Sequence, residues 1–389
     1  MSTARRRATK QAGKNEAVGR REPDTATPHR SDPATPKGGS APRSVFLAGF
    51  AAVVLCLYVY YSSLSSPDGK WQPQALPLDL PFTVVDIPGK GKGSIAARDI
   101  KQGERILREE PLFILPSQVR VQGSPGAIVL SALASLSPHQ RDAFYNLSYV
   151  NFPRHLTPNS PSYHETMALA IFETNAIGAD DDGTGIFPTT ARLNHGCSAA
   201  FNAVYSWRSS EGALVVHALK NIKEGEELLT TYFDTKRPRD SRREHLRTHY
   251  GFTCQCSVCS LPDGESQKSD SRLLKMAELY ERFRTWRDGA LTGKQAVDVA
   301  REIWALGDEE GYWSERGQLA ADAAWVAAAH ADLRATRSWA QLAQKWFGFE
   351  LGADSTHARS MDEVIANPDS LRYRTGATRA PENVGSPDA

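Results

Sequence analysis

The sequence ARLNHGC, residues 191–197, places an amide, an imidazole and a thiol in four successive positions. Three more thiols follow with C-x-C-x-x-C spacing in residues 254–259. A structural zinc site is tetrahedral and takes four Cys or His ligands, so this triplet needs one more ligand. The chain has five cysteines, and Cys56 lies in an apolar run, which leaves one thiol to complete the set. The sequence therefore predicts one zinc ion bound by Cys197, Cys254, Cys256 and Cys259.

The same stretch starts a longer motif series. Asn194-His195-x-Cys197, then Gly225-Glu-Glu-Leu228 with Tyr232, then C-x-C-x-x-C at 254–259, resembles SET-domain protein lysine methyltransferases. The resemblance covers roughly residues 81 to 259 and is strongest to fungal-type SET proteins of the branch that includes the SET-and-MYND proteins. Two features depart from that pattern. In the first, Gly196 replaces the usual serine and two extra residues precede Asn202. In the second, no cysteine lies between Lys101 and Arg192, so the MYND finger is missing.

The resemblance implies an α+β fold in which short β-strands form a SET-type pseudoknot, with the strand that ends at Tyr232 beside Asn194 and His195. It implies S-adenosylmethionine as cofactor and Tyr232 as the catalytic residue. Without the other motifs, Gly91-Lys92-Gly93 would be only a tight turn, and His195 would be a structural histidine. Asn175 fits a cofactor contact and a helix C-terminus equally well. The implied cofactor-binding residues are Gly91, Lys92, Gly93, Asn175, Asn194, His195 and Phe252, and the implied substrate-channel residues are Tyr250 and Phe252.

Residues 45–64 form an uncharged apolar run, and a helix of that length rises ~30 Å, about the thickness of a bilayer's hydrocarbon core. A cleaved signal peptide would have a shorter leader, and a buried helix would need a fold around it. We expect a single membrane span at 44–64, in an endomembrane such as the endoplasmic reticulum or the nuclear envelope. The charge rule favours a luminal catalytic domain, whereas zinc-binding thiolates favour a reducing compartment, so the side stays open.

The segments around this span have little apolar content. Residues 1–43 carry ten Lys or Arg against four Asp or Glu and are predicted to be a disordered basic tail, with a nucleic-acid-binding arm as the alternative. Residues 65–80 are predicted to be a proline-rich linker. The formal net charge of +1 gives no clear case for nucleic-acid binding by the whole chain.

The C-terminal part shows apolar residues at helical spacing. We expect a SET and post-SET domain over 81–259, a polar linker over 260–270, an all-α domain over 271–373 and a disordered tail over 374–389. The helical domain is similar to the tetratricopeptide-style region of the nearest relatives. It contains six of the eight tryptophans, which are expected in its core rather than in a ligand cage.

Two functions are compatible with these motifs. The first is S-adenosylmethionine-dependent methylation of a lysine in a protein substrate, which is favoured because Tyr232, Asn194 and His195 are all present. The second is a non-catalytic SET-fold scaffold. A zinc-based nucleic-acid module is disfavoured because neither a second ligand pair nor a basic helix follows the cysteines. The substrate, the degree of methylation and the oligomeric state stay open.

Overall fold

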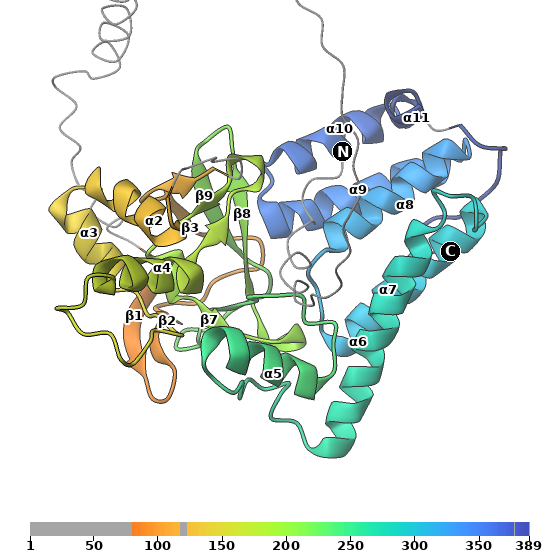
Figure 1. The fold of residues 1–389 in the computed structure, drawn as a ribbon. Helices are drawn as coiled ribbons and strands as arrows, with labels where there is room; N and C mark the ends of the chain where they lie inside the picture. Colours follow the sequence, from red (N-terminus) through yellow and green to blue (C-terminus); the bar gives the residue numbers. More distant parts are fainter. Residues whose placement is uncertain (1–79, 117–122, 377, 389) are drawn as a thin grey trace, which may run out of the picture. The chain divides into compact units, whose positions relative to one another are not determined.

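The structure, a computed structural model, describes residues 80–116, 123–376 and 378–388. From Leu80 onward the chain forms one compact unit. Its first part is built of short strands with three helices inserted, and its last part is helical (Figure 1). The predicted α+β class is therefore confirmed for the described residues.

The strands are short, as the glycine-punctuated sequence indicates. The longer ones are β1 Phe82–Ile87, β2 Gly91–Ala96, β3 Arg105–Glu109, β8 Ala203–Arg208 and β9 Ala213–Ala218. The two-residue strands are β4 Ile114–Leu115, β5 Ile177–Gly178, β6 Thr184–Gly185, β7 Asn194–His195 and β10 Leu229–Thr230.

The strands pair in four small sheets. β1 and β2 form an antiparallel hairpin, β9 lies between β3 and β8, β6 lies between β4 and β5, and β7 pairs with β10 in parallel. The β1–β2 turn depends on Gly89 and Gly91, which both have φ of +75°, a conformation that glycine adopts without strain. β9 is buried along its whole length because it is the central strand of its sheet.

Helices α2 Pro125–Ala134, α3 Pro138–Tyr145 and α4 Tyr163–Asn175 lie between β4 and β5. Ser124 and Ser137 cap the first two through their side-chain oxygens, and a proline follows each cap at the start of the helix. These helices share an apolar cluster that includes Val129, Phe144 and Ile171.

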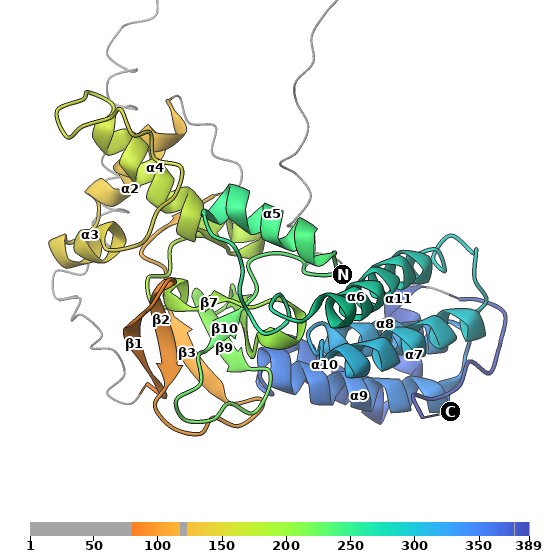
Figure 2. The ribbon, with the colours of Figure 1, turned by 90° about the horizontal axis from the view of Figure 1, so that it is seen from below.

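The C-terminal part is helical, as predicted. Its helices are α5 Arg239–Tyr250, α6 Asp263–Arg284, α7 Gly293–Glu310, α8 Arg316–Ala329, α9 Leu333–Leu351, α10 Thr356–Ala366 and α11 Asp369–Thr375. Figures 1 and 2 show α6 beside α7 and α8 beside α9. Trp286, Trp339 and Trp346 are buried, which confirms that these tryptophans serve the core. The same core also contains Phe201 and Leu219 from the strand-rich part.

The expected linker over 260–270 is wrong for most of its length, because α6 begins at Asp263. The first turn of α6 carries Asp263 and Glu265, and acidic residues there interact favourably with the helix dipole. Ser266 and Ser269 of the same segment are buried. Local polarity is typical of a linker, but tertiary contacts turn these residues into helix.

The expected disordered tail over 374–389 is also wrong where it is described. Val384 is 1% exposed and belongs to the core of the helical part. The carboxylate of Glu382 accepts hydrogen bonds from the N–H groups of Gly293 and Lys294 at the start of α7, at 2.8 and 3.1 Å. The indole of Trp339 donates to the Gly385 carbonyl at 3.0 Å. Residues 378–388 are therefore a packed C-terminal strap, although they form no helix or strand.

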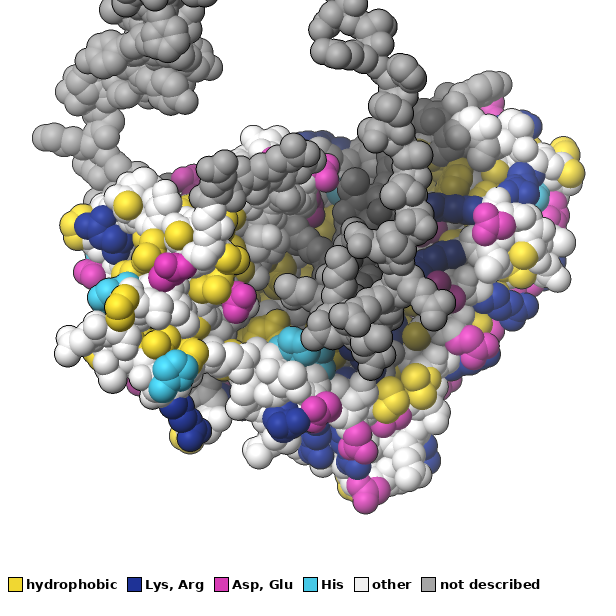
Figure 3. All heavy atoms as spheres, viewed as in Figure 1, with side chains coloured by type: hydrophobic (Ala, Val, Ile, Leu, Met, Phe, Trp, Pro, Cys, Tyr) yellow, Lys and Arg dark blue, Asp and Glu magenta, His cyan; other side chains and the backbone are white. Residues whose placement is uncertain are grey.

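No helix among the described residues is long and apolar enough to cross a bilayer. The predicted basic tail at 1–43, span at 44–64 and linker at 65–80 lie outside the described residues, apart from Leu80. On the face shown in Figure 3, acidic and basic side chains of the described residues are interspersed rather than gathered by sign.

Candidate functional site

The parallel pair β7–β10 brings together two segments that are far apart in the sequence. Asn194 lies opposite Leu229 and His195 opposite Thr230, and the N–H of Gly196 donates to the Thr230 carbonyl at 2.8 Å. The chain then continues from β10 directly to Tyr232. The predicted placement of the strand before Tyr232 beside the Asn-His segment is confirmed, although this strand ends at Thr230 rather than at Tyr232. We call this place the β7–β10 crossing.

Strand β2 joins this crossing from the other side. The N–H of Leu228 donates to the Ser94 carbonyl at 2.8 Å. A Cβ atom at Gly93 would lie 2.7 Å from the Asn194 amide nitrogen and 2.3 Å from Cδ1 of Ile87, so only glycine lets β2 come this close. The Gly91-Lys92-Gly93 segment and Asn194 are therefore neighbours, as the motif series predicts.

Glu227 contacts both the Asn-His segment and the β1–β2 turn, although no separate role was predicted for it. Its carboxylate accepts from the Asn194 amide at 2.9 Å and pairs with the ammonium of Lys90 at 2.5 Å. Lys92 instead pairs with Asp86 at 2.8 Å on the exposed side of the hairpin. Glu227 could have been found from the sequence, because it is the second glutamate of the G-E-E-L motif.

His195 is buried, and both of its ring nitrogens have protein partners. Nδ1 accepts from the N–H of Tyr232 at 3.2 Å, so the proton of the neutral ring is on Nε2, which lies 3.1 Å from the sulfur of Cys197. Burial lowers the pKa of His195 to about 4, which keeps the ring neutral. The imidazole thus links Tyr232 to the thiol cluster, and its role as a cofactor contact stays a prediction.

The Tyr232 hydroxyl donates to the Leu193 carbonyl at 3.0 Å, immediately before β7. Its ring centroid lies 4.9 Å from that of Tyr250 and 5.2 Å from that of His195. Burial raises the pKa of Tyr232 well above its ordinary value. The phenol is therefore neutral, and it can donate and accept hydrogen bonds but is a poor general base.

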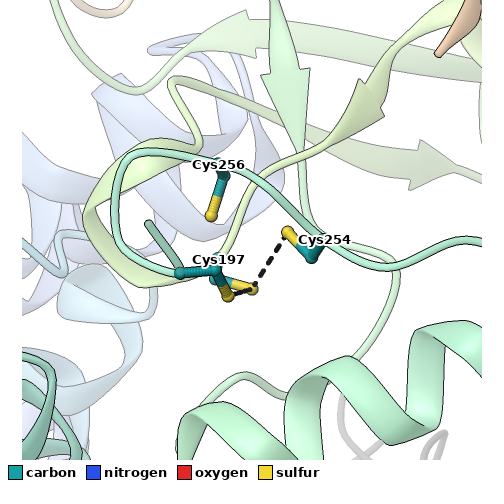
Figure 4. A group of neighbouring side chains, drawn as sticks. Cys197, Cys254 and Cys256 are labelled. Carbon is teal, nitrogen blue, oxygen red and sulfur yellow. Dashed lines mark hydrogen bonds between the residues drawn. The ribbon is translucent and has the colours of Figure 1, made fainter. Parts of the chain in front are cut away.

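The four cysteines predicted to bind zinc converge in one buried cluster. Their sulfur atoms all lie within 4.8 Å of one another, and all four thiols are free. Figure 4 shows Cys197, Cys254 and Cys256 turned toward a common centre. The sulfur of Cys197 lies 3.9 Å from that of Cys254 and 3.6 Å from that of Cys259. A tetrahedral ion with Zn–S bonds of ~2.3 Å places its sulfurs about 3.8 Å apart, so the donor set fits zinc.

The cluster is supported by α5. Arg243 donates to the carbonyls of Cys254 and Cys259 at 3.3 and 2.8 Å, which holds the C-x-C-x-x-C loop against the helix. The fully buried Arg242 pairs with Asp270 at 2.9 Å, and its charge also interacts with Cys197 and Cys259. A centre with four thiolates and Zn²⁺ carries two negative charges, and a buried guanidinium beside it partly offsets them.

The expected channel residues lie against this cluster. Tyr232, Phe233, Tyr250 and Phe252 are half-buried and pack on the same apolar group as the cysteines. Gly251, with φ of +71°, ends α5 between the two channel residues. The structure therefore brings together the thiols and the aromatic side chains, as the sequence predicts, while the channel itself stays a prediction.

Asn175 is the last residue of α4, and its side chain caps local backbone. Its amide donates to the carbonyls of Ser148 and Ile171 at 2.6 and 2.8 Å. This geometry matches the helix-terminus alternative, and the cofactor contact of Asn175 stays a prediction.

Two further residues brace the crossing and were not predicted from the sequence. The carboxylate of Glu109, on β3, accepts from the N–H groups of Thr189 and Thr190, both at 2.7 Å, in the turn that leads to β7. Asn202 exchanges backbone and side-chain hydrogen bonds with Leu229 on β10. Asn202 could have been found from the sequence, because it is the asparagine that lies two residues later than in the family pattern. Glu109 belongs to no motif.

Comparison with known proteins agrees with this geometry. The SET domain family model matches residues 91–233. Histone-lysine N-methyltransferase set5 of Schizosaccharomyces pombe is 28% identical over 301 residues, which cover 77% of this chain and 88% of the relative. Human N-lysine methyltransferase SMYD2 is 37% identical over 92 residues, which cover 24% of this chain and only 20% of SMYD2.

Among solved structures, Rubisco LSMT bound to AdoMet aligns over 76% of this chain and 89% of its own, at 11% identity and a TM-score of 0.31. The β7–β10 strand pair lies within the matched residues. The family model and the sequence relatives together show that this chain contains a SET domain and is similar to lysine methyltransferases.

Proposed function

We propose that this chain transfers a methyl group from S-adenosylmethionine to a lysine side chain of a protein substrate. The observation that carries the proposal is the convergence of Gly93, Asn194 and Tyr232 at the β7–β10 crossing. The residues present fit the cofactor chemically. They offer an amide, a glycine backbone and a half-buried phenol within one small region. The SET domain match and the relatives' names support the same reaction.

When bound, S-adenosylmethionine supplies a methyl group already activated by its sulfonium. The protein then has mainly to orient the acceptor, because a well-aligned displacement gains more from positioning than from acid–base catalysis. We assign cofactor binding to the Gly91–Gly93 backbone, Asn194 and the His195 segment. We assign alignment of the transfer to the Tyr232 hydroxyl and the neighbouring Leu193 carbonyl.

The target lysine must be neutral to act as a nucleophile. Burial raises the pKa values of both Tyr232 and Tyr250, so neither phenol carries a charge that would hold the lysine protonated. An apolar environment of aromatic rings favours a neutral amine by desolvation. We assign Tyr250 and Phe252 to the walls of this lysine channel, with the lysine proton passing to water.

We also propose that Cys197, Cys254, Cys256 and Cys259 bind one structural zinc ion. The sulfur spacing and burial support this set, and four protein ligands leave no open position for catalysis. Because Tyr250 and Phe252 pack on the same cluster, the ion would fix the aromatic wall as well as the loop.

The predicted span at 44–64 would anchor the enzyme to an endomembrane. The side of the membrane can be read from Asn146, which starts an N-x-S sequon and is exposed at the end of α3. A glycan on Asn146 in cells would place the SET domain in the lumen. An unmodified Asn146 together with protease access from the cytosol would place it on the cytosolic side.

The activity is tested by incubating the purified protein with a cell lysate and radiolabelled S-adenosylmethionine, followed by mass spectrometry of labelled proteins. The proposal expects methyl groups on lysine nitrogens that depend on the added enzyme. A protein that binds the cofactor but labels no lysine in any lysate would contradict the proposal and favour the scaffold function.

A further inference from the structure

A short turn in the helical part contacts the loop that directly follows the proposed zinc ligand Cys197. This segment, residues 310–316, is the α7–α8 turn, and it contacts residues 198–200, which directly follow Cys197. We propose that the α7–α8 turn holds this loop in place, so that Glu310 acts as a positioning residue for the zinc ligand Cys197. The inference rests on the zinc centre proposed above.

Glu310 is the last residue of α7 and is 5% exposed. Its Oε1 accepts from the hydroxyls of Ser198 and Ser269, at 2.8 and 2.6 Å, and its Oε2 accepts from Arg272 at 2.8 Å. A buried carboxylate is costly unless it is paired and hydrogen-bonded, and here Arg272 supplies the counter-charge. One side chain thus joins α6 and α7 to the loop after Cys197.

The loop needs such support because of its backbone conformation. Ser198 has φ of +45°, in the left-handed region that non-glycine residues rarely adopt and that surrounding contacts must maintain. Its side chain is held by Glu310, and its N–H donates to the Thr235 hydroxyl at 3.2 Å. Ser198 follows Cys197 directly, so the contacts that hold Ser198 also hold the peptide group that joins it to Cys197.

Further contacts join the same two segments. The ammonium of Lys220 donates to the carbonyls of both Ala199 and Gly311, at 2.6 and 2.9 Å, and so bridges the loop and the turn. A Cβ atom at Gly311, whose φ is +66°, would lie 3.1 Å from Cβ of Ala199, which shows how closely the segments approach. The buried Lys236, next to Thr235, pairs with Glu315 of the turn at 3.3 Å, so the segment that accepts from Ser198 is tied to the same turn.

These contacts make the helical part a component of the zinc centre rather than a separate module. Zinc leaves such a site when one ligand segment swings away, and Cys197 is the ligand distant in sequence from the other three. Contacts that are lost in this opening raise the barrier to zinc release. The bond from Ser198 to Glu310 is one of them, whereas the bond from Ser269 to Glu310 lies within the helical part.

The two serines provide a matched pair of variants, Ser198→Ala and Ser269→Ala. Each removes one hydroxyl that donates to the same oxygen of Glu310, so a general effect on stability should be similar in both. Zinc release from the full-length protein into excess 4-(2-pyridylazo)resorcinol is followed at pH 7.5, together with thermal melting. We expect Ser198→Ala to release zinc about tenfold faster than wild type, as loss of one hydrogen bond to a charged group allows.

Ser269→Ala should release zinc within about twofold of the wild-type rate, because the segment that it loosens does not follow a zinc ligand. Equal release rates for Ser198→Ala and wild type, or equal acceleration by both variants, would overturn the proposal. A wild-type protein that purifies without zinc would instead refute the zinc centre, and this inference with it. The wild-type measurement thus separates the failure of the zinc proposal from the failure of the positioning role.

Discussion

Glu109 provides a quantitative test of how the strand-rich part positions the Asn-His segment. It lies at the end of β3, and its carboxylate accepts from the N–H groups of Thr189 and Thr190 at 2.7 Å and from the Thr190 hydroxyl at 2.8 Å. These contacts fix the turn that precedes Leu193 and β7. Burial raises the pKa of Glu109, while the hydrogen bonds from both threonines oppose the shift.

The change Glu109→Gln keeps the size of the side chain but replaces one accepting oxygen with an NH₂ group. At least one of the three donors then faces another donor and loses its partner. A hydrogen bond to a charged group contributes about 1.5–3 kcal/mol, and an unsatisfied buried N–H costs about 1–3 kcal/mol. These two ranges describe the same lost contact and are not added. Because both end at about 3 kcal/mol, we expect the free energy of unfolding to fall by about 3 kcal/mol.

Urea unfolding at pH 7.5 measures this change, with Glu110→Gln as the control. Glu110 is the next residue, is exposed and pairs only at the surface with Arg108 at 3.1 Å, so its loss should cost no more than about 0.5 kcal/mol. Calorimetry should also show weaker binding of S-adenosylmethionine by Glu109→Gln, because the turn leads directly to Asn194. If the two variants are equally stable and bind the cofactor equally well, Glu109 does not brace the site.

Three further changes have defined outcomes. Cys197→Ser should abolish zinc binding, whereas the control Cys56→Ser should retain it, as measured by plasma mass spectrometry. Zinc in both variants would rule out the proposed ligand set. Burial raises the pKa of Glu350 from 4.5 to about 7. Between these two pH values the folded chain keeps a proton on Glu350 that the unfolded chain has released. The free energy of unfolding should therefore fall as the pH rises from about 4.5 to about 7. Urea unfolding at pH 5 and pH 8 measures this fall, which should be smaller in Glu350→Gln than in wild type by up to about 3 kcal/mol. An identical pH dependence of the two proteins would contradict the assignment. Deleting residues 378–389 removes the buried Val384 and the carbonyl that accepts from Trp339, and should cost about 3 kcal/mol by circular dichroism melting, with an unchanged midpoint as the contrary result.

The parts of the site that could be predicted from the sequence are those with a local pattern or a count. Five cysteines with one in an apolar run leave a single solution for a four-thiol site, and the structure brings those four together. The G-E-E-L segment and the Asn-His segment could be placed side by side from the family resemblance. A glycine after a helical stretch is a common stop signal, and Gly251 ends α5 in the left-handed conformation.

The parts that could not be predicted depend on contacts between residues distant in sequence. The segment that begins α6 is rich in Ser, Asp and Gly, which is typical of a linker. In the structure, however, Ser269 is buried and donates a hydrogen bond to Glu310. Val384 is a lone apolar residue in a polar tail, and only the assembled helices provide the core that buries it. Glu109 has no local motif, because its partners Thr189 and Thr190 lie about 80 positions away.

The most direct test of the proposed methyl transfer separates cofactor binding from the transfer step in Tyr232→Phe. This change removes only the hydroxyl that donates to Leu193, and Tyr145→Phe, at an exposed tyrosine on α3, is the control. Calorimetry gives the affinity for S-adenosylmethionine. Single-turnover labelling of a protein substrate found in the lysate experiment gives the transfer rate. We expect Tyr232→Phe to bind the cofactor about as tightly as wild type but to transfer the methyl group slower by a factor on the order of 100, as loss of a transition-state hydrogen bond does. A transfer rate equal to that of wild type and Tyr145→Phe would contradict the role of Tyr232 in catalysis.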